Sequence, residues 1–305
     1  MTEPQTEPGT AATSLVELLQ LEAIDENLFR GRCQAGSPLR AFGGQVAGQA
    51  LTAAGRTVTD SRAVHSLHGY FVRPGDPRQP IVYRTERIRD GRSYSTRRVT
   101  AVQGDEVVFT LSASFKEPEE TVERQRAMPV VPAPEELPDP YLAWAKADPD
   151  GYAQTSPAHS LQMRFVPPDS AGLPAQVPGA PQQFIWMRAA TPLPVGEPLL
   201  QVCALTYLSD LTLASTTAMH LQAPRFRRSG PPRLMMASLD HAMWFHRAFR
   251  ADEWLLFAQR SPSSADGRGL ALGEFYDRGG ALVASAVQEV LLRERRVPGQ
   301  SRSRS

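Results

Sequence analysis

The sequence has 305 residues, of which 41% are hydrophobic and 21% are charged, so it can bury the core of one large domain or of two ordinary ones. Its formal net charge is +1, which excludes a strong general attraction to nucleic acid or to an acidic membrane surface. The two cysteines, Cys33 and Cys203, are too few for a disulfide framework and favour a reducing compartment.

The chain also lacks the patterns of exported and membrane-spanning proteins. Residues 1–8 are acidic and contain no apolar segment typical of a signal peptide, and no apolar run reaches the length of a membrane span. We therefore expect a cytoplasmic enzyme or binding protein with no nucleic-acid partner and no membrane span.

The first patterned region, residues 14–117, predicts helices packed on an antiparallel sheet. Ser14 and Glu17 form a capping-box pattern before an amphipathic helix that extends to residue 21. A second helix, rich in small residues, is predicted at 45–56. Strands are predicted at 28–32, 64–72, 79–87, 94–102 and 106–115. A helix on a mostly antiparallel sheet indicates an α+β fold.

An acidic, proline-rich segment at 118–153 is interpreted as a linker to a second region at 154–295. A short helix near 141–147 is predicted inside this linker. The second region predicts a strand at 184–188, a helix at 197–212, and strands at 235–247 and 254–261. It ends in a β-hairpin whose two runs, 270–276 and 282–292, flank a turn that contains glycine.

The second region repeats the first. Residues 62–115 align without a gap on 238–291, and the turns and strands coincide along the whole alignment. The matched positions include His65 with His241, Gly104 with Gly280 and, at a different offset, Gln45 with Gln201. We infer two copies of one helix-plus-sheet unit joined by the linker.

The two copies differ at three polar positions. The aligned pairs are Gln288 with Ser112, Asp210 with Ala54, and Ser238 with Arg62. Only the second copy therefore holds an amide, an acid and a hydroxyl at these places. Gln288 shares its strand face with apolar residues, where an unpaired amide would cost roughly 1–3 kcal/mol, so it requires a polar partner.

Several familiar sites are missing. The chain has no phosphate-binding loop, no H-E-x-x-H motif and no nucleophile elbow, since the nearest match at 91–95 lacks the final glycine. His65 and His68 are predicted on opposite faces of a strand, and so are His241 and His246, which suits a metal poorly. We expect no metal and no cofactor.

Blocks of consecutive residues resemble the type II acyl-CoA thioesterases, the TesB family. In the second half these blocks are LMMASLDHAMWFHR at 234–247, DEWLLF at 252–257, GEFY at 273–276 and LVASAVQE at 282–289. In the first half they are FGGQ at 42–45 and VHSLHGYFVRPGD at 64–76. The resemblance covers residues 14–294 and implies a double hotdog, in which each half wraps an antiparallel sheet around a long central helix.

The resemblance also implies a catalytic set of Asp210, Ser238 and Gln288. Many members of the family carry threonine where this chain has Ser238, which keeps the hydroxyl and loses the methyl that stiffens χ1. A thioester carbonyl can be attacked by an activated water, so no covalent nucleophile is required. Asp210 would be the general base or would orient the water, while Ser238 and Gln288 hold it. Backbone N–H groups near Gly43 and Gly44 would stabilise the oxyanion.

The expected reaction is hydrolysis of fatty acyl-CoA to free fatty acid and CoA by a homo-oligomer, a dimer or a tetramer. Two other hypotheses stay open: an enoyl-CoA hydratase that would use His220 with an acid, and a catalytically inactive acyl-CoA-binding protein. Asp210 can also be explained as a local helix-end hydrogen bond and Gln288 as a cross-sheet contact. His241, close to Ser238 in the sequence, is a rival general base.

Overall fold

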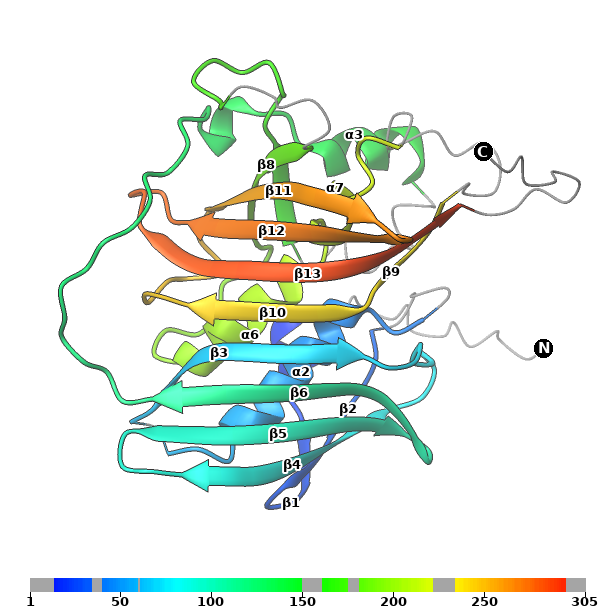
Figure 1. Cartoon of the computed structure of the whole chain (residues 1–305), viewed down its shortest axis with the longest axis vertical. Coiled ribbons are helices and arrows are strands. Elements are labelled where there is room, and N and C mark those ends of the chain that lie inside the picture. The colour runs from blue at the N-terminus through cyan, green and yellow to red at the C-terminus, as the bar shows by residue number, and fades with distance from the viewer. Residues whose placement is uncertain are drawn as a thin grey trace, which may run out of the picture.

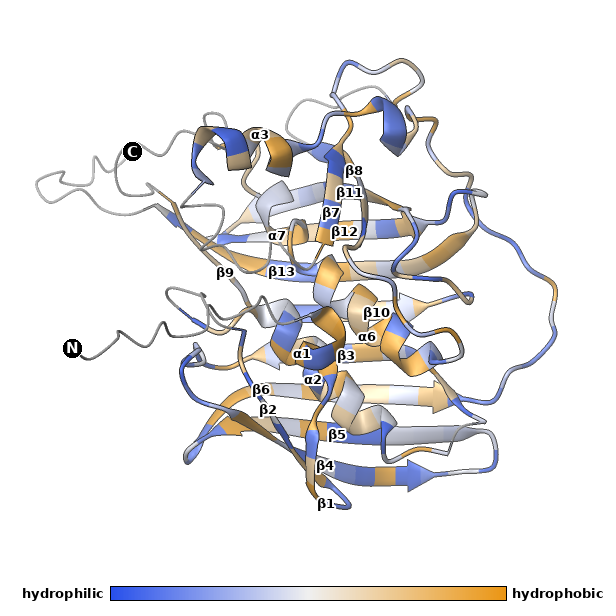
Figure 2. Cartoon of the chain, turned by 180° about the vertical axis from the view of Figure 1, so that it is seen from behind, coloured by the Kyte–Doolittle hydropathy of each residue, from blue (hydrophilic) through white to orange (hydrophobic). Residues whose placement is uncertain are grey.

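The computed structural model describes residues 14–34, 40–59, 61–149, 161–174, 181–221 and 234–294. The predicted boundary between the linker and the second unit, at 153–154, lies outside these ranges. Within them the chain forms one antiparallel sheet of 13 strands, with helices on one of its faces (Figures 1 and 2).

The first half supplies six strands and two helices to this arrangement. The strands are β1 (Glu22–Asp25), β2 (Leu28–Gly31), β3 (Ala63–Phe71), β4 (Ile81–Asp90), β5 (Tyr94–Gln103) and β6 (Glu106–Lys116). The helices are α1 (Leu15–Leu19) and α2 (Gly43–Gly55). The predicted capping box is present at α1, where Ser14 Oγ accepts from the Glu17 N–H at 3.2 Å and the Ser14 N–H donates to Glu17 at 2.8 Å.

The second half supplies the remaining strands and two further helices on the same face. The strands are β7 (Leu161–Phe165), β8 (Gln182–Ala189), β9 (Leu234–Ser238), β10 (Asp240–Phe245), β11 (Leu255–Ala265), β12 (Arg268–Tyr276) and β13 (Leu282–Glu294). The helices are α6 (Pro198–Ser209) and α7 (Leu213–Thr216). Between the halves, the linker holds η1 (Pro134–Glu136) and α3 (Pro140–Ala147) and runs along one edge of the molecule (Figure 1).

The two halves join edge to edge. The strand order is β1-β2-β4-β5-β6-β3-β10-β13-β12-β11-β8-β7, and β9 pairs with β13 beside this path. β3 and β10 form the antiparallel junction, so one ladder continues from the first half into the second. Above the junction α2 and α6 lie against each other on the same face of the sheet. This confirms the prediction of two helix-on-sheet units in an α+β fold.

Small residues allow α2 and α6 to approach closely. A Cβ atom at Gly44 would lie 2.5 Å from the carbonyl oxygen of Tyr207, and one at Gly48 would lie 3.0 Å from that of Cys203. Glycine is poor in a helix interior, but here a side chain would force the two backbones apart. The composition of the predicted helix is therefore explained by its contact with a second helix as well as with the sheet.

Gly44→Ala is expected to destabilise the protein by about 1–3 kcal/mol, because the new methyl group meets a backbone oxygen that cannot rotate away. The midpoint of urea unfolding measures the change. Gly104→Ala is a useful comparison, since nothing lies within 4 Å of the corresponding Cβ and only its positive φ of 57° is unfavourable. A Gly44→Ala variant as stable as the parent chain would contradict this packing argument.

Three features differ from the sequence prediction. β1 and β7 are additional short strands, and the four residues of β1 are all exposed, so they carry no alternating pattern. The predicted helix at 197–212 ends at Ser209 and is followed by the separate turn of helix α7. The predicted strand at 235–247 is divided into β9 and β10 at Leu239.

Candidate active site

The polar residues singled out from the sequence meet at the C-terminal end of α6. Asp210 follows the last helical residue and is 9% exposed. Gln288 Nε2, on β13, donates to Asp210 Oδ1 at 2.6 Å. Ser238 Oγ, at the end of β9, donates to the same oxygen at 3.4 Å, a long and weak bond. The structure therefore brings all three residues together.

The first half of the chain completes this site. The backbone N–H of Gly44, in the first turn of α2, also donates to the Asp210 carboxylate. A Cβ atom at Gly43 would lie 2.7 Å from Asp210 Oδ2, so this approach requires glycine at that position too. The positive end of the α2 dipole thus points toward an acid from the other half. The N–H groups predicted to stabilise an oxyanion include one that already binds this carboxylate.

Burial changes the acidity of Asp210. Removal from water raises its pKa to about 6 from the ordinary value of 3.8, although the hydrogen bonds from Gln288, Gly44 and Ser238 and the charge of Arg40 act in the opposite direction. A carboxylate with this pKa is ionised at neutral pH and is a much stronger base than an ordinary one. It has the properties expected of a general base.

Within the part of the chain that the structure describes, the Gln288 side chain is hydrogen-bonded through its amide nitrogen but not through its amide oxygen. The side chain is fully buried, and its Nε2 contacts Asp210, while its Oε1 has no hydrogen-bond partner among the described residues. A buried acceptor without a partner is costly, roughly 1–3 kcal/mol, and such groups occur at functional sites. Gln288 Oε1 is therefore a candidate acceptor for a hydrogen bond from a small ligand beside the carboxylate.

The equivalent place in the first half is filled by other side chains. Arg62, which aligns with Ser238, donates to Ser95 Oγ and to the carbonyl oxygens of Gly91 and Arg92, at 2.8 and 3.0 Å for the two carbonyls. At the end of α2, a Cβ atom on Gly55 would clash with the Leu199 side chain. The first half therefore has an engaged arginine at the position of the hydroxyl, and Ala54, at the position of the acid, has no polar side chain.

The rival base, His241, is a weaker candidate. It is completely buried, its Nε2 lies 2.7 Å from Ser209 Oγ, and burial lowers its pKa to about 4. Asp210, with a pKa of about 6, is the stronger base of the two. His220, which a hydratase would require, is exposed after α7, whereas Asp210 is buried.

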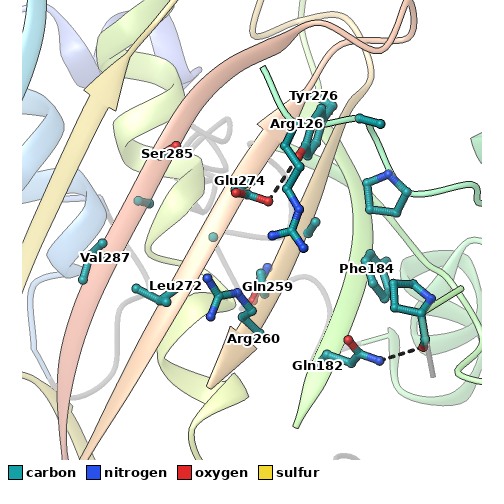
Figure 3. Close-up of a pocket in the computed structure, with 16 residues that line it drawn as sticks. Arg126, Gln182, Phe184, Gln259, Arg260, Leu272, Glu274, Tyr276, Ser285 and Val287 are labelled. Carbon is teal, nitrogen blue, oxygen red and sulfur yellow. Dashed lines mark hydrogen bonds between the residues drawn. The ribbon is translucent and has the colours of Figure 1, made fainter. Parts of the chain in front are cut away.

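A cavity of about 420 Å³ lies elsewhere, on the outer face of the second half. Its lining includes Arg126, Arg260, Glu274 and Val287, and in Figure 3 the linker residue Arg126 reaches across the strands toward the interior of the cavity. Val287 and Gln288 point to opposite faces of β13, because neighbouring side chains alternate along a strand. This cavity therefore contains none of the three candidate residues.

Within the described ranges, no group of three or more His, Cys, Asp or Glu side chains is placed to hold a metal ion. None of the helices in the same ranges is long and apolar enough to cross a membrane. Both cysteines are free thiols, and burial raises the pKa of Cys203 to about 12.

Comparison with known proteins agrees with the geometry. Profiles of the acyl-CoA thioesterase N-terminal and C-terminal domains match residues 33–116 and 130–292. Acyl-coenzyme A thioesterase 8 of Homo sapiens is 37% identical over 297 residues, covering 94% of this chain and 91% of the relative. The crystal structure of an acyl-CoA thioesterase II, TesB2, from Mycobacterium marinum is 43% identical, with a TM-score of 0.77, and covers 94% of this chain and 99% of that one.

The fold agrees with a more distant structure as well. A protein from Alicyclobacillus acidocaldarius described as having a hot dog fold is 23% identical, with a TM-score of 0.71, and covers 92% of this chain and 98% of that one. This match supports the fold alone, the predicted double hotdog. With both domain profiles matched and relatives similar over nearly their whole length, the chain belongs to the type II acyl-CoA thioesterase family.

Proposed function

We propose that the chain hydrolyses fatty acyl-CoA to free fatty acid and CoA, with Asp210 as the general base. The observation that carries this proposal is a buried carboxylate of pKa about 6 that receives hydrogen bonds from Gln288, Ser238 and Gly44. Family membership supplies the substrate class, and the site supplies the residues.

The geometry supports attack by a water molecule. Gln288 Nε2 orients the Asp210 carboxylate, and Gln288 Oε1 is available to accept a hydrogen bond from the water. Ser238 Oγ donates its proton toward Asp210, so its lone pairs are an alternative acceptor for the water proton that does not go to the base. The site thus offers a base for one water proton and two alternative acceptors for the other.

The reaction balances without another reagent. The water oxygen bonds to the thioester carbonyl carbon while Asp210 takes one of its protons. Collapse of the tetrahedral intermediate breaks the carbon–sulfur bond and releases the fatty acid. The proton held by Asp210 passes to the departing CoA sulfur, which restores the carboxylate.

Quantification of free CoA by chromatography, after incubation with acyl-CoAs of graded chain length, tests the reaction. Release of CoA in proportion to fatty acid supports hydrolysis. Loss of the enoyl absorbance of an enoyl-CoA without release of CoA would instead indicate a hydratase. Tight binding of acyl-CoA with neither change would indicate an inactive binding protein.

The activity is expected to rise with pH through about 6, because the base must lose its proton before it can accept one from water. Measurement of kcat/KM between pH 4.5 and 8 should give a single acid limb with its midpoint near that value. A rate that is constant over this range, or that falls as the pH rises, would exclude Asp210 as the base.

We also propose that the chain works in the cytoplasm as a homo-oligomer, a dimer or a tetramer. The helices cover one face of the sheet (Figure 2). Apolar side chains on or beside β3 are exposed, Tyr70 to 64% and Val72 to 48%, and can pack against another copy of the chain. Light scattering after size-exclusion chromatography measures the mass, and a strictly monomeric protein at micromolar concentration would refute the proposal.

A further inference from the structure

A β-bulge lies beside the candidate site, where β9 passes into β10. Ser238 of β9 pairs with Val290 of β13, and the next pair along β13 is Ala242 of β10 with Val287. Residues 239–241 on one side are therefore opposed by only 288–289 on the other. One extra residue in one strand of an antiparallel pair is the definition of a bulge.

The bulge decides which way Ser238 points. His241 and Met243 of β10 are fully buried on the inner face, so Ala242 and Trp244 point outward. In a regular strand Ser238 would share the outward face with Ala242, because side chains alternate. The extra residue reverses this order, and Ser238 instead faces inward beside Val290, which is fully buried.

Asp240 closes the bulge with its side chain. The Glu289 N–H donates to Asp240 Oδ1 at 2.6 Å instead of to a backbone carbonyl of the opposite strand. A conventional bond, from the Leu239 N–H to Glu289 O at 2.9 Å, lies directly beside it. Asp240 thus ties the segment that follows Ser238 to the residue that follows Gln288.

We propose that Asp240 is a positioning residue that holds Ser238 and Gln288 in register around Asp210. The carboxylate touches neither the base nor any reacting atom that the proposed mechanism requires. Its effect on turnover comes through the backbone of the two residues that surround the water. The inference rests on the catalytic roles proposed above, which it refines.

The first half indicates that the bulge can form without this carboxylate. β3 and β6 show a register shift at the same place, between Val64 and Ser66, and Val64 aligns with Asp240. An apolar side chain is therefore compatible with the bulged backbone. Asp240→Ala is expected to fold, with looser placement of the strands beside it.

Asp240→Ala is expected to lower kcat about 10- to 100-fold, since a misplacement of about 1 Å can have an effect of that size, while KM changes by less than about twofold. Asp240→Asn retains an oxygen that can accept the Glu289 N–H, so its kcat should stay within about threefold of the parent value. An Asn variant as impaired as the Ala variant would overturn the proposal, because the charge and not the hydrogen bond would then be required.

Asp277→Ala is the matched control. Asp277 Oδ1 also accepts a backbone N–H, that of Ala281 at 2.8 Å, in the turn that leads into the same strand. This turn lies roughly 20 Å from Gln288 along β13. Both variants lose one carboxylate-to-backbone bond, so both should lose similar stability. If kcat, measured well below both unfolding temperatures, falls no further in Asp240→Ala than in Asp277→Ala, the proposal fails.

A double-mutant cycle separates this inference from the proposed mechanism. In a Ser238→Ala/Gln288→Ala background, Asp240→Ala should reduce the residual kcat by less than about twofold, because the groups that it positions are gone. A full additional loss in that background would show that Asp240 acts elsewhere. Full activity of the Ser238→Ala/Gln288→Ala background itself would refute the catalytic roles, whatever the result at Asp240.

Discussion

Replacement of Asp210 by asparagine is expected to lower kcat by about 10²–10⁴-fold, because the amide cannot accept a proton from water. The amide oxygen can still accept from Gln288, so the site should keep its shape. Free CoA release under saturating acyl-CoA measures the loss, and near-ultraviolet circular dichroism checks the packing of the buried aromatic residues. An Asp210→Asn variant with more than about a tenth of the parent kcat would contradict the role of general base.

The same substitution is expected to stabilise the folded chain at neutral pH. The pKa of Asp210 is raised to about 6, above its ordinary value of 3.8, so the folded state holds this proton more tightly than the unfolded state. Stability is therefore lost as the pH rises from about 4 through 6, and above this range the loss is constant at about 3 kcal/mol. An uncharged asparagine avoids this cost.

Urea unfolding at two pH values tests this consequence. At pH 8 Asp210→Asn should be more stable than the parent chain, by up to about 3 kcal/mol, and near pH 4 the difference should be small. A variant that is less stable at both pH values would show that burial of the ionised carboxylate does not destabilise the folded chain. Lower activity together with higher stability is the pattern expected when a residue serves the reaction at the expense of the fold.

Gln288→Ala is expected to lower kcat by about 10²–10³-fold, the effect typical of removing one preorganised polar group from a catalytic site. The substitution should also move the acid limb of the pH profile above 6. The hydrogen bond from Gln288 lowers the pKa of Asp210, so its loss leaves burial less opposed and raises the pKa further. Measurement of kcat/KM against pH gives both quantities in one experiment.

Gln259 offers a matched control for this second variant. It is also a buried amide on the inner face, 2% exposed, and it contacts Thr212, Thr216 and Gln183 instead of an acid. Gln259→Ala should cost stability as any lost buried network does, while the acid limb stays near its original pH. If the acid limb shifted equally in both variants, the shift would reflect general loosening of the fold. If it did not shift in Gln288→Ala, the proposal that the Gln288 hydrogen bond lowers the pKa of Asp210 would be wrong.

Much of the secondary structure follows from local sequence. The pattern of Ser14 and Glu17 predicts the capping box that begins α1, and the glycine-containing turn after β12 predicts the hairpin in which Gly280 has a φ of 87°. The internal alignment predicts the duplication, because turns recur at the same spacing in both halves. The cap and the turn depend on neighbouring residues, and the duplication on a comparison of the chain with itself, so none of them requires knowledge of the tertiary structure.

Three properties of the site were decided only by tertiary structure. The Gly44 N–H reaches Asp210 because α2 and α6 pack across the junction between the halves, a contact between distant parts of the chain. The pKa of Asp210 depends on how completely the surrounding chain excludes water. Ser238 faces this acid because a bulge interrupts the strand that was predicted to be continuous at 235–247. Alternation along the sequence cannot reveal such an inversion, because it arises from pairing with β13, and pairing is set by residues far away in the chain.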